Sequence, residues 1–222
     1  MKRLAVVGAI TLAVTLAACG GSNDANNEAS AKNELIGLVR SPKLDVSEVS
    51  LPEVTNGLDE QPFRMRAAND RLLVVYFGYT RCPDICPTSL AALRRAYTEI
   101  REDADRMDTA MVTVDPARDT GEVLTEYLQN FFESNYHALR VEDETLLEAA
   151  EKPFLASSSV TLSATAHDDP HASGNEPIVT HTGTTYAVDE NGIVVVEWPF
   201  GTEADTIAND LEILFDRMDK AT

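Results

Sequence analysis

Apolar runs and amphipathic segments alternate along most of the chain, a pattern that favours a mixed α/β sheet with helices on both faces. Residues 72–77 (LLVVYF) form a continuous apolar run, as expected for a strand covered on both faces. Residues 109–114 (TAMVTV) indicate a second buried strand. Residues 87–101 and 121–132 follow these runs and carry apolar side chains at helical spacing, so the pattern predicts two successive strand–helix units.

Shorter elements flank these two units. Weak alternation around Pro52 and Gly57 indicates short N-terminal strands joined by a turn. A strong hairpin signal, DENG at residues 189–192, joins the last two predicted strands. The flanking elements are expected as strands over residues 45–65, 136–141, 182–188 and 193–198, and as helices over residues 143–154 and 203–218.

Residues 156–177 are small and polar, which predicts a surface loop, although SSVTLSA within them could form an edge strand. His167 and His171 lie in this loop, where they form either an accessory metal site or a pair of solvated side chains. Pro170 argues against a helix that would present both imidazoles on one face. We therefore expect both histidines to be solvated.

The first residues have the pattern of a signal peptide, with Lys2 and Arg3 ahead of an apolar stretch too short to span a membrane. The stretch ends in LAAC, which resembles a bacterial lipobox and implies cleavage before Cys19 and lipid attachment to its thiol. An ordinary signal peptide with an incidental cysteine is the alternative. We expect a signal peptide over 1–18, a lipid-anchor site and polar tether over 19–42, and a folded domain over 43–222.

The formal net charge of −19 limits the range of partners. Binding to nucleic acid needs a basic patch that neutralises phosphates, so nucleic acid is not expected as a partner. The charge suits a domain held off an anionic bilayer, and it favours cationic partners. The signal peptide and the lipid-anchor site predict an extracytoplasmic location in the cell envelope, where the domain is tethered to a membrane.

Two of the three cysteines, Cys82 and Cys86, follow the first long apolar run within the stretch YFGYTRCPDICPTSL. A structural disulfide, a redox couple and a metal site all suit such a pair. A static bridge explains it poorly, because closing so small a loop stabilises a fold little. The extracytoplasmic location would nevertheless allow the two thiols to form a disulfide when oxidised.

Pro87 suggests how the pair is presented. Proline is favoured at the first helical position, which predicts Cys86 as the N-cap and Cys82 in the loop before the helix. Both sulfurs would then lie near the positive end of the helix dipole, which favours thiolates. Thiolates serve both disulfide exchange and soft-metal binding, so this placement leaves the redox and the metal interpretations open.

His181 is the candidate third donor, because it precedes a predicted strand at the end of the sheet where the cysteines are expected. Two thiolates and one imidazole suit Cu(I), and also Cu(II). The alternative is a histidine hydrogen-bonded at a strand start. Spacing alone favours neither interpretation.

The residues after the second buried strand also have two interpretations. Asp115 either lies near the metal site and tunes it electrostatically, or belongs to a turn. Asp119 or Thr120 is expected as the N-cap of the next helix, and we favour that capping role for Thr120. The role of Asp115 stays open at this stage.

The stretches FGYTRCPDICPTSL, VDPARDT and THTGTTYAVDENG resemble, in this order, the Sco/SenC family of copper-binding assembly factors for cytochrome c oxidase. The resemblance runs from about residue 45 to residue 218. It implies a thioredoxin-like fold with one copper, Cu(I) or Cu(II), bound by Cys82, Cys86 and His181. Thr180 departs from the family pattern, in which many members have Asp before the histidine.

The resemblance implies a membrane-anchored copper metallochaperone that delivers copper to the dinuclear copper A site of cytochrome c oxidase subunit II, or that prepares this site. A thiol–disulfide oxidoreductase that reduces a partner's cysteines is the alternative, with Cys82 and Cys86 as its redox pair. A peroxiredoxin-like peroxidase shares the fold, but it would not need a distant metal-binding histidine. His181 distinguishes the first two functions, because a dithiol reductase needs no imidazole ligand.

Overall fold

The computed structural model describes residues 34–57, 61–161 and 177–221. Cys19, His167 and His171 lie outside these residues, so the expectations for them stay predictions. The strands are β1 Ser50–Glu53, β2 Gln61–Arg64, β3 Leu72–Gly78, β4 Met107–Thr113, β5 Tyr136–Leu139, β6 Ser158–Thr161, β7 Ile178–His181, β8 Thr185–Val188 and β9 Val194–Trp198. The α-helices are α2 Ile85–Glu99, α3 Gly121–Gln129, α4 Glu144–Glu151 and α5 Ala204–Ala221, and the 3-10 helices are η1 Thr55–Gly57, η2 Arg101–Arg106 and η3 Lys152–Phe154.

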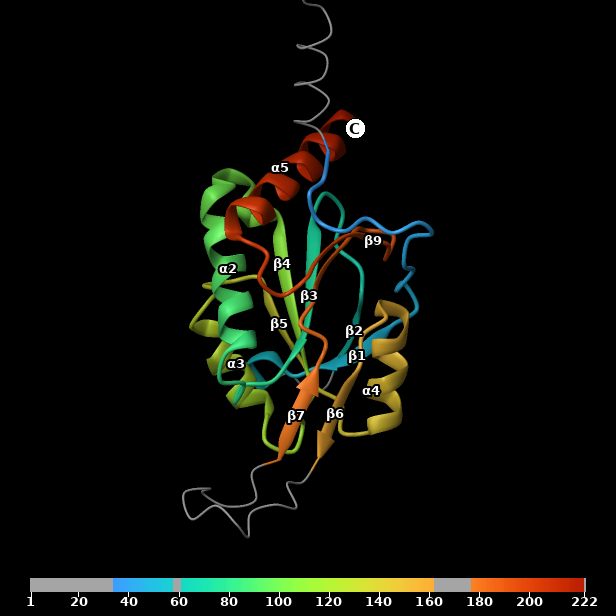
Figure 1. Cartoon of the computed structure of the whole chain (residues 1–222), viewed down its shortest axis with the longest axis vertical. Coiled ribbons are helices and arrows are strands. Elements are labelled where there is room, and N and C mark those ends of the chain that lie inside the picture. The colour runs from blue at the N-terminus through green and yellow to red at the C-terminus, as the bar shows by residue number, and fades with distance from the viewer. Residues whose placement is uncertain (1–33, 58–60, 162–176, 222) are drawn as a thin grey trace, which may run out of the picture. The chain divides into compact units, whose positions relative to one another are not determined.

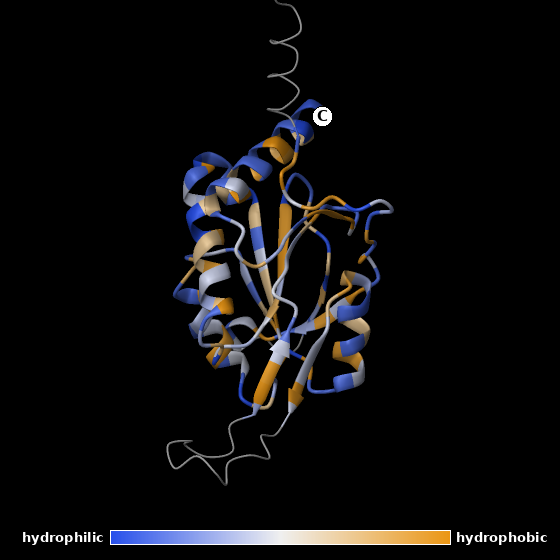
Figure 2. Cartoon of the chain, in the orientation of Figure 1, coloured by the Kyte–Doolittle hydropathy of each residue, from blue (hydrophilic) through white to orange (hydrophobic). Residues whose placement is uncertain are grey.

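The main sheet is mixed, with the strand order β2-β1-β5-β4-β3-β8-β9 (Figure 1). β3 pairs in parallel with β4, β4 in parallel with β5, and β3 antiparallel with β8. All seven residues of β3 are buried, as its continuous apolar run predicts. Figure 2 shows the central strand β3 mainly in orange, and helices in which hydrophilic and hydrophobic residues alternate.

Helices cover both faces of the sheet, because successive side chains of β3 point to opposite sides. On one face, the ring of Tyr76 and the Cα of Gly78 lie against the start of α2. On the other face, the Phe77 ring packs 5.3 Å from Phe154, which directly follows α4. α2 and α4 accordingly lie on opposite sides of the central strands in Figure 1. Among the described helices, none has both the length and the apolar character needed to cross a bilayer.

Most predicted elements are present with shifted ends. The N-terminal strands pair as a hairpin, with Ser50 opposite Arg64, and β8 and β9 form the predicted C-terminal hairpin. The edge strand proposed within residues 156–177 is β6. The strand predicted from residue 182 was placed three residues too early, because Thr182 instead bonds Ser157 beside β6. β7 was not predicted from the sequence, and it pairs with β6 in a separate two-stranded sheet.

Candidate metal centre

The two cysteines lie where β3 passes into α2. The chain turns after Gly78, and the Cys82 N–H donates to the carbonyl of Tyr79 at 3.3 Å. The helix begins at Ile85 with Asp84 in the N-cap position, although the Asp84 side chain makes no capping hydrogen bond. The prediction that Cys86 is the N-cap is therefore wrong, and Cys86 lies inside the first turn.

Cys86 belongs to the buried face of α2, together with Leu90 and Leu93 one and two turns further along. The Cys86 residue is 0% exposed, against 8% for Cys82. Its sulfur lies so close to β3 that a Cβ at Gly78 would approach it to 2.9 Å. A glycine at this position therefore provides the room for the Cys86 side chain.

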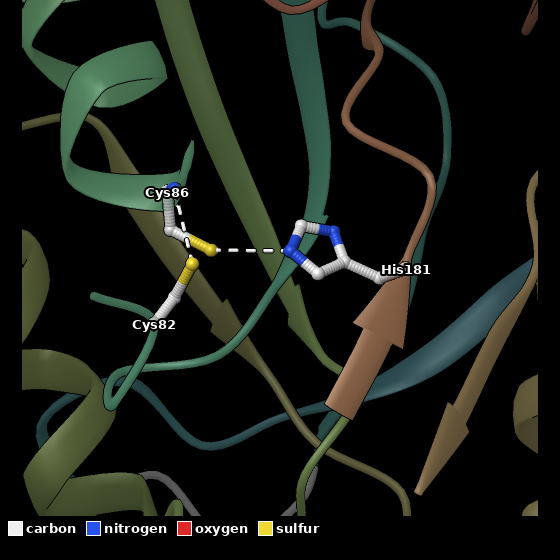
Figure 3. Close-up of side chains that lie close together, drawn as sticks. All are labelled: Cys82, Cys86 and His181. Carbon is white, nitrogen blue, oxygen red and sulfur yellow. Dashed lines mark hydrogen bonds between the residues drawn. The ribbon is translucent and has the colours of Figure 1, made fainter. Parts of the chain in front are cut away.

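Three donor side chains converge at this point (Figure 3). The donor atoms of Cys82, Cys86 and His181 all lie within 4.8 Å of one another. The Cys86 Sγ is 3.5 Å from the Nε2 of His181, and both cysteines are free thiols. His181 is the last residue of β7, so the small sheet contributes the imidazole while the strand–helix junction contributes the sulfurs. The structure thus brings together all three residues that sequence analysis selected.

Hydrogen bonding orients the His181 ring for metal binding. Its Nδ1 lies 3.1 Å from the carbonyl of Thr182, which can only accept a hydrogen bond, so Nδ1 carries the proton. Burial lowers the pKa of His181, which keeps the imidazole neutral. The Nε2 lone pair of this tautomer then faces the Cys86 sulfur, the arrangement in which an imidazole ligates a metal.

The two sulfurs differ in their surroundings. Burial raises the pKa of the Cys86 thiol to about 12, so the expectation that a helix start would favour a thiolate there is wrong for the metal-free protein. The Cys86 N–H, in the first turn of α2, donates to the Cys82 Sγ at 3.3 Å. The positive end of the helix therefore acts on Cys82, while the apolar surroundings dominate at Cys86.

Two tyrosine rings flank His181 edge-on, with ring centroids 6.1 Å away for Tyr76 and 5.7 Å away for Tyr79. Burial raises the pKa of Tyr79 to about 12, so its hydroxyl stays protonated. The Tyr76 hydroxyl is buried close to Cys86 and Ser89, yet it has no hydrogen-bond partner of good geometry within the described residues. These rings restrict access of water to the donor atoms.

Asp119 positions the loop that carries Cys82, a role that sequence analysis missed. Its carboxylate, fully buried, accepts hydrogen bonds from the Thr80 N–H at 3.0 Å and the Thr80 hydroxyl at 2.6 Å. It also accepts one from the Thr113 hydroxyl at the end of β4, at 2.7 Å. Thr120, rather than Asp119, caps α3, as the favoured interpretation predicted.

Asp115 is buried and pairs with Arg118. This ion pair holds the turn between β4 and α3, which supports the structural interpretation of Asp115.

His137 takes no part in the metal centre. Its Nδ1 lies 2.8 Å from a carboxylate oxygen of Glu53, which joins β5 to β1.

A comparison with family models decides the family. Residues 55–216 match the SCO1/SenC model, which is most of the chain. The chain belongs to the SCO1/SenC family. The metal centre lies within the matched residues, so the family assignment and the convergent donors concern the same part of the chain.

The relatives share a modest part of their sequence with this SCO1/SenC protein. The SCO2-like protein RP587 of Rickettsia prowazekii is 32% identical over 121 residues, which are 54% of this chain and 55% of the relative. The match to another curated relative spans 36% of that protein's length. The chain thus spans about half or less of these curated relatives.

Solved structures share the fold. ScoI of Arabidopsis thaliana with copper bound has a TM-score of 0.60 at 21% identity, covering 76% of this chain and 95% of that one. BsSco, described as a member of the Sco family of cytochrome c oxidase assembly proteins, has a TM-score of 0.55 at 16% identity, covering 82% and 98%. The likeness to these Sco proteins supports the thioredoxin-like fold expected from the sequence.

Proposed function

We propose that this SCO1/SenC protein is a copper metallochaperone that binds one copper ion through Cys82, Cys86 and His181. The observation that carries the proposal is the convergence of these three donor atoms within 4.8 Å. Two sulfurs and one imidazole form a soft donor set, which suits Cu(I) and also accepts Cu(II). A structural zinc site would require a fourth protein ligand.

The residues around the donors prepare them for an ion. The neutral His181 already presents Nε2, and the Cys86 thiol is held in place by its buried surroundings. Thiols must lose their protons to become ligands, so copper binding releases protons from Cys82 and Cys86. The positive charge of copper offsets the burial that keeps the Cys86 thiol protonated in the metal-free protein.

The bound copper is the cargo, and its proposed destination is the copper A site of cytochrome c oxidase subunit II. This destination rests on the family and on BsSco, a structural relative described as belonging to cytochrome c oxidase assembly proteins. Cys82 is the less buried of the two sulfur donors. It is therefore the sulfur ligand that an incoming thiolate of the partner would replace more readily.

Copper transfer to a reduced, copper-free soluble domain of subunit II tests this function. Wild-type protein loaded with Cu(I) should deliver the metal, measured as copper that elutes with the recipient after the two proteins are separated. His181→Ala should bind copper less tightly and lose it to a competing chelator before transfer. Retention of all copper by the wild-type protein in the presence of the recipient would contradict the proposal.

A thiol–disulfide oxidoreductase is the second candidate, favoured by the two free thiols at one helix start. The Cys82 thiolate would attack one sulfur of a partner's disulfide and release the other as a thiolate. Cys86 would then attack the Cys82 sulfur, leaving a Cys82–Cys86 disulfide and a fully reduced partner. The same transfer experiment separates the two functions, because metal-free His181→Ala should reduce an oxidised subunit II as fast as wild type only if this second function holds.

We further propose that Cys19 is lipidated and tethers the domain to the outer face of a membrane. The support is the LAAC sequence after an apolar stretch with a basic start. Native protein should partition with membranes, and Cys19→Ser should release the protein or leave its signal uncleaved, as measured by fractionation and mass spectrometry. Recovery of soluble mature wild-type protein with an unmodified Cys19 would contradict lipidation.

A further inference from the structure

A groove of about 1070 Å³ lies between α4, β6 and the residues after β4. In Figure 1, α4 and β6 lie close together on the side of the central strands away from α2. The groove is lined by charged residues of α4 and by residues 157–160 in and before β6. Its residues do not include the donors Cys82, Cys86 and His181, so it is a second candidate binding site.

The charge in the groove comes mainly from one face of α4. Glu144, Glu148 and Glu151 line it and recur at helical spacing, one turn apart. Like charges at this spacing repel, and the pKa of Glu151 is raised by its burial and, to a smaller extent, by the charge of Glu148. A helix face of this kind is stabilised when a cation binds between the carboxylates.

Glu151 lies at the base of this row and lacks a partner for one oxygen. Its residue is 3% exposed, and its Oε1 is buried without a hydrogen-bond partner in the described part of the chain. Ser158 lies beside the carboxyl group and offsets part of the effect of burial, which raises the pKa of Glu151. A buried acceptor without a partner costs free energy, and the cost is removed when a ligand donates to it.

The cations of the groove do not neutralise these carboxylates. Arg140 is engaged by the carbonyl oxygens of Pro116 and Asp119 and by the Glu142 carboxylate. Lys152 is exposed at the rim, and its single positive charge is outnumbered by the three glutamates of α4 that line the groove. The groove therefore favours a positively charged ligand.

Apolar side chains beside the carboxylates indicate that the ligand is larger than a simple cation. Leu155 is 60% exposed and Val160 is 47% exposed, and both line the groove. Figure 2 shows the apolar end of β6 in orange. Apolar contacts next to one buried and two exposed carboxylates suit a peptide segment in which basic and apolar residues are mixed.

We propose that this groove binds a basic, apolar-flanked segment of a partner protein, and that an arginine or lysine side chain of the segment donates to the free oxygen of Glu151. The segment's apolar residues cover Leu155 and Val160, and its remaining positive charge lies against Glu144 and Glu148. The protein's strongly negative charge, formally −19, speeds the encounter with such a partner.

The groove is connected to the metal centre through one strand pair. Ser158, which lies beside the Glu151 carboxyl group, is the cross-strand neighbour of His181. Next to this pair, the Thr182 N–H donates to the Ser157 carbonyl and the Ser157 N–H donates to the Thr182 hydroxyl. The Thr182 carbonyl in turn accepts from the His181 ring. A segment that binds at Glu151 therefore contacts the strand that positions the imidazole ligand.

The test uses reduced, metal-free full-length protein and a short peptide of alternating leucine and arginine, with binding measured by calorimetry and mapped by NMR. The arginine peptide should bind, with amide shifts at Glu151, Ser158 and His181. The same peptide with citrulline in place of arginine should bind about tenfold more weakly, because it keeps the shape and loses the charge.

Glu151→Gln should lower the affinity for the arginine peptide about tenfold, and Glu148→Gln should lower it about threefold. The matched control Glu126→Gln removes the same charge from an exposed position on α3 and should leave the affinity unchanged. Equal binding of the citrulline peptide, equal weakening by the control, or amide shifts that leave out Glu151 and Ser158 would each overturn the proposal. Because Glu148 is exposed, its variant decides the matter even if Glu151→Gln fails to fold.

Discussion

Cys86→Ala is expected to lower the affinity for Cu(I) more than about 100-fold, since even a residue that only orients a metal ligand contributes 10–100-fold. The substitution removes one of two thiolates and leaves one sulfur with one imidazole. Cys82→Ala should have a similar effect for the same reason. A competition titration with a Cu(I)-specific chelator measures both affinities on reduced protein.

His181→Ala should have a smaller effect on Cu(I), because both thiolates remain and Cu(I) accepts low coordination. The same variant should alter or lose the sulfur-to-copper charge-transfer absorption of the Cu(II) form, since Cu(II) needs the nitrogen donor. The unequal losses distinguish a three-donor site from a dithiolate that binds copper incidentally.

His167→Ala combined with His171→Ala is the matched control, because it removes two imidazoles from a loop that the sequence predicts to be solvated. It should leave both copper forms nearly unchanged. An unaltered Cu(II) spectrum and affinity in His181→Ala would contradict the site. Copper would then be bound by the cysteines and another donor, and the oxidoreductase function would become the better proposal.

Asp119→Ala is expected to destabilise the metal-free fold by about 3 kcal/mol, because it leaves the Thr80 N–H and two hydroxyls without their acceptor in a buried place. The loop that carries Cys82 would lose its attachment to β4. Copper affinity should therefore fall as well, although Asp119 is not proposed as a ligand. Thermal unfolding and the same chelator titration measure the two effects.

Asp143→Ala is the control for this second prediction. Asp143 also accepts backbone hydrogen bonds, from Thr145 and Leu146, but it caps α4 and does not contact the cysteine loop. Its loss should cost about 1 kcal/mol and leave copper affinity unchanged. If Asp119→Ala lowered stability while copper affinity stayed the same, Asp119 would be structural only.

The parts of the fold predicted from sequence are those governed by neighbouring residues. The apolar run of β3, the Thr120 cap and the hairpin turn at residues 189–192 each follow from local pattern. The two cysteines could be selected by residue type and spacing, whereas His181 was selected among four histidines by its expected place in the sheet and by the Sco/SenC resemblance. The distances among the donor atoms of Cys82, Cys86 and His181 confirm that these residues lie together.

The parts that were missed depend on contacts between distant residues. Asp119 acts on Thr80, and no local pattern links these two residues. The burial of Cys86 had a local signal, because Cys86, Leu90 and Leu93 share one helical face. Pro87, at the following position, led to the prediction that Cys86 is the N-cap. The apolar surroundings of the Cys86 sulfur raise the pKa of its thiol, whereas a helix start was expected to lower it.

The small sheet that carries His181 has a consequence for how fast metal can leave. A two-stranded sheet is only marginally stable by itself, and β7 pairs with β6 and not with the seven-stranded sheet that supports the cysteines. The imidazole can therefore withdraw by a local movement of β6 and β7 while both sulfurs keep their places. Release then needs no opening of the core, so a centre that binds its ion tightly can still give it up quickly.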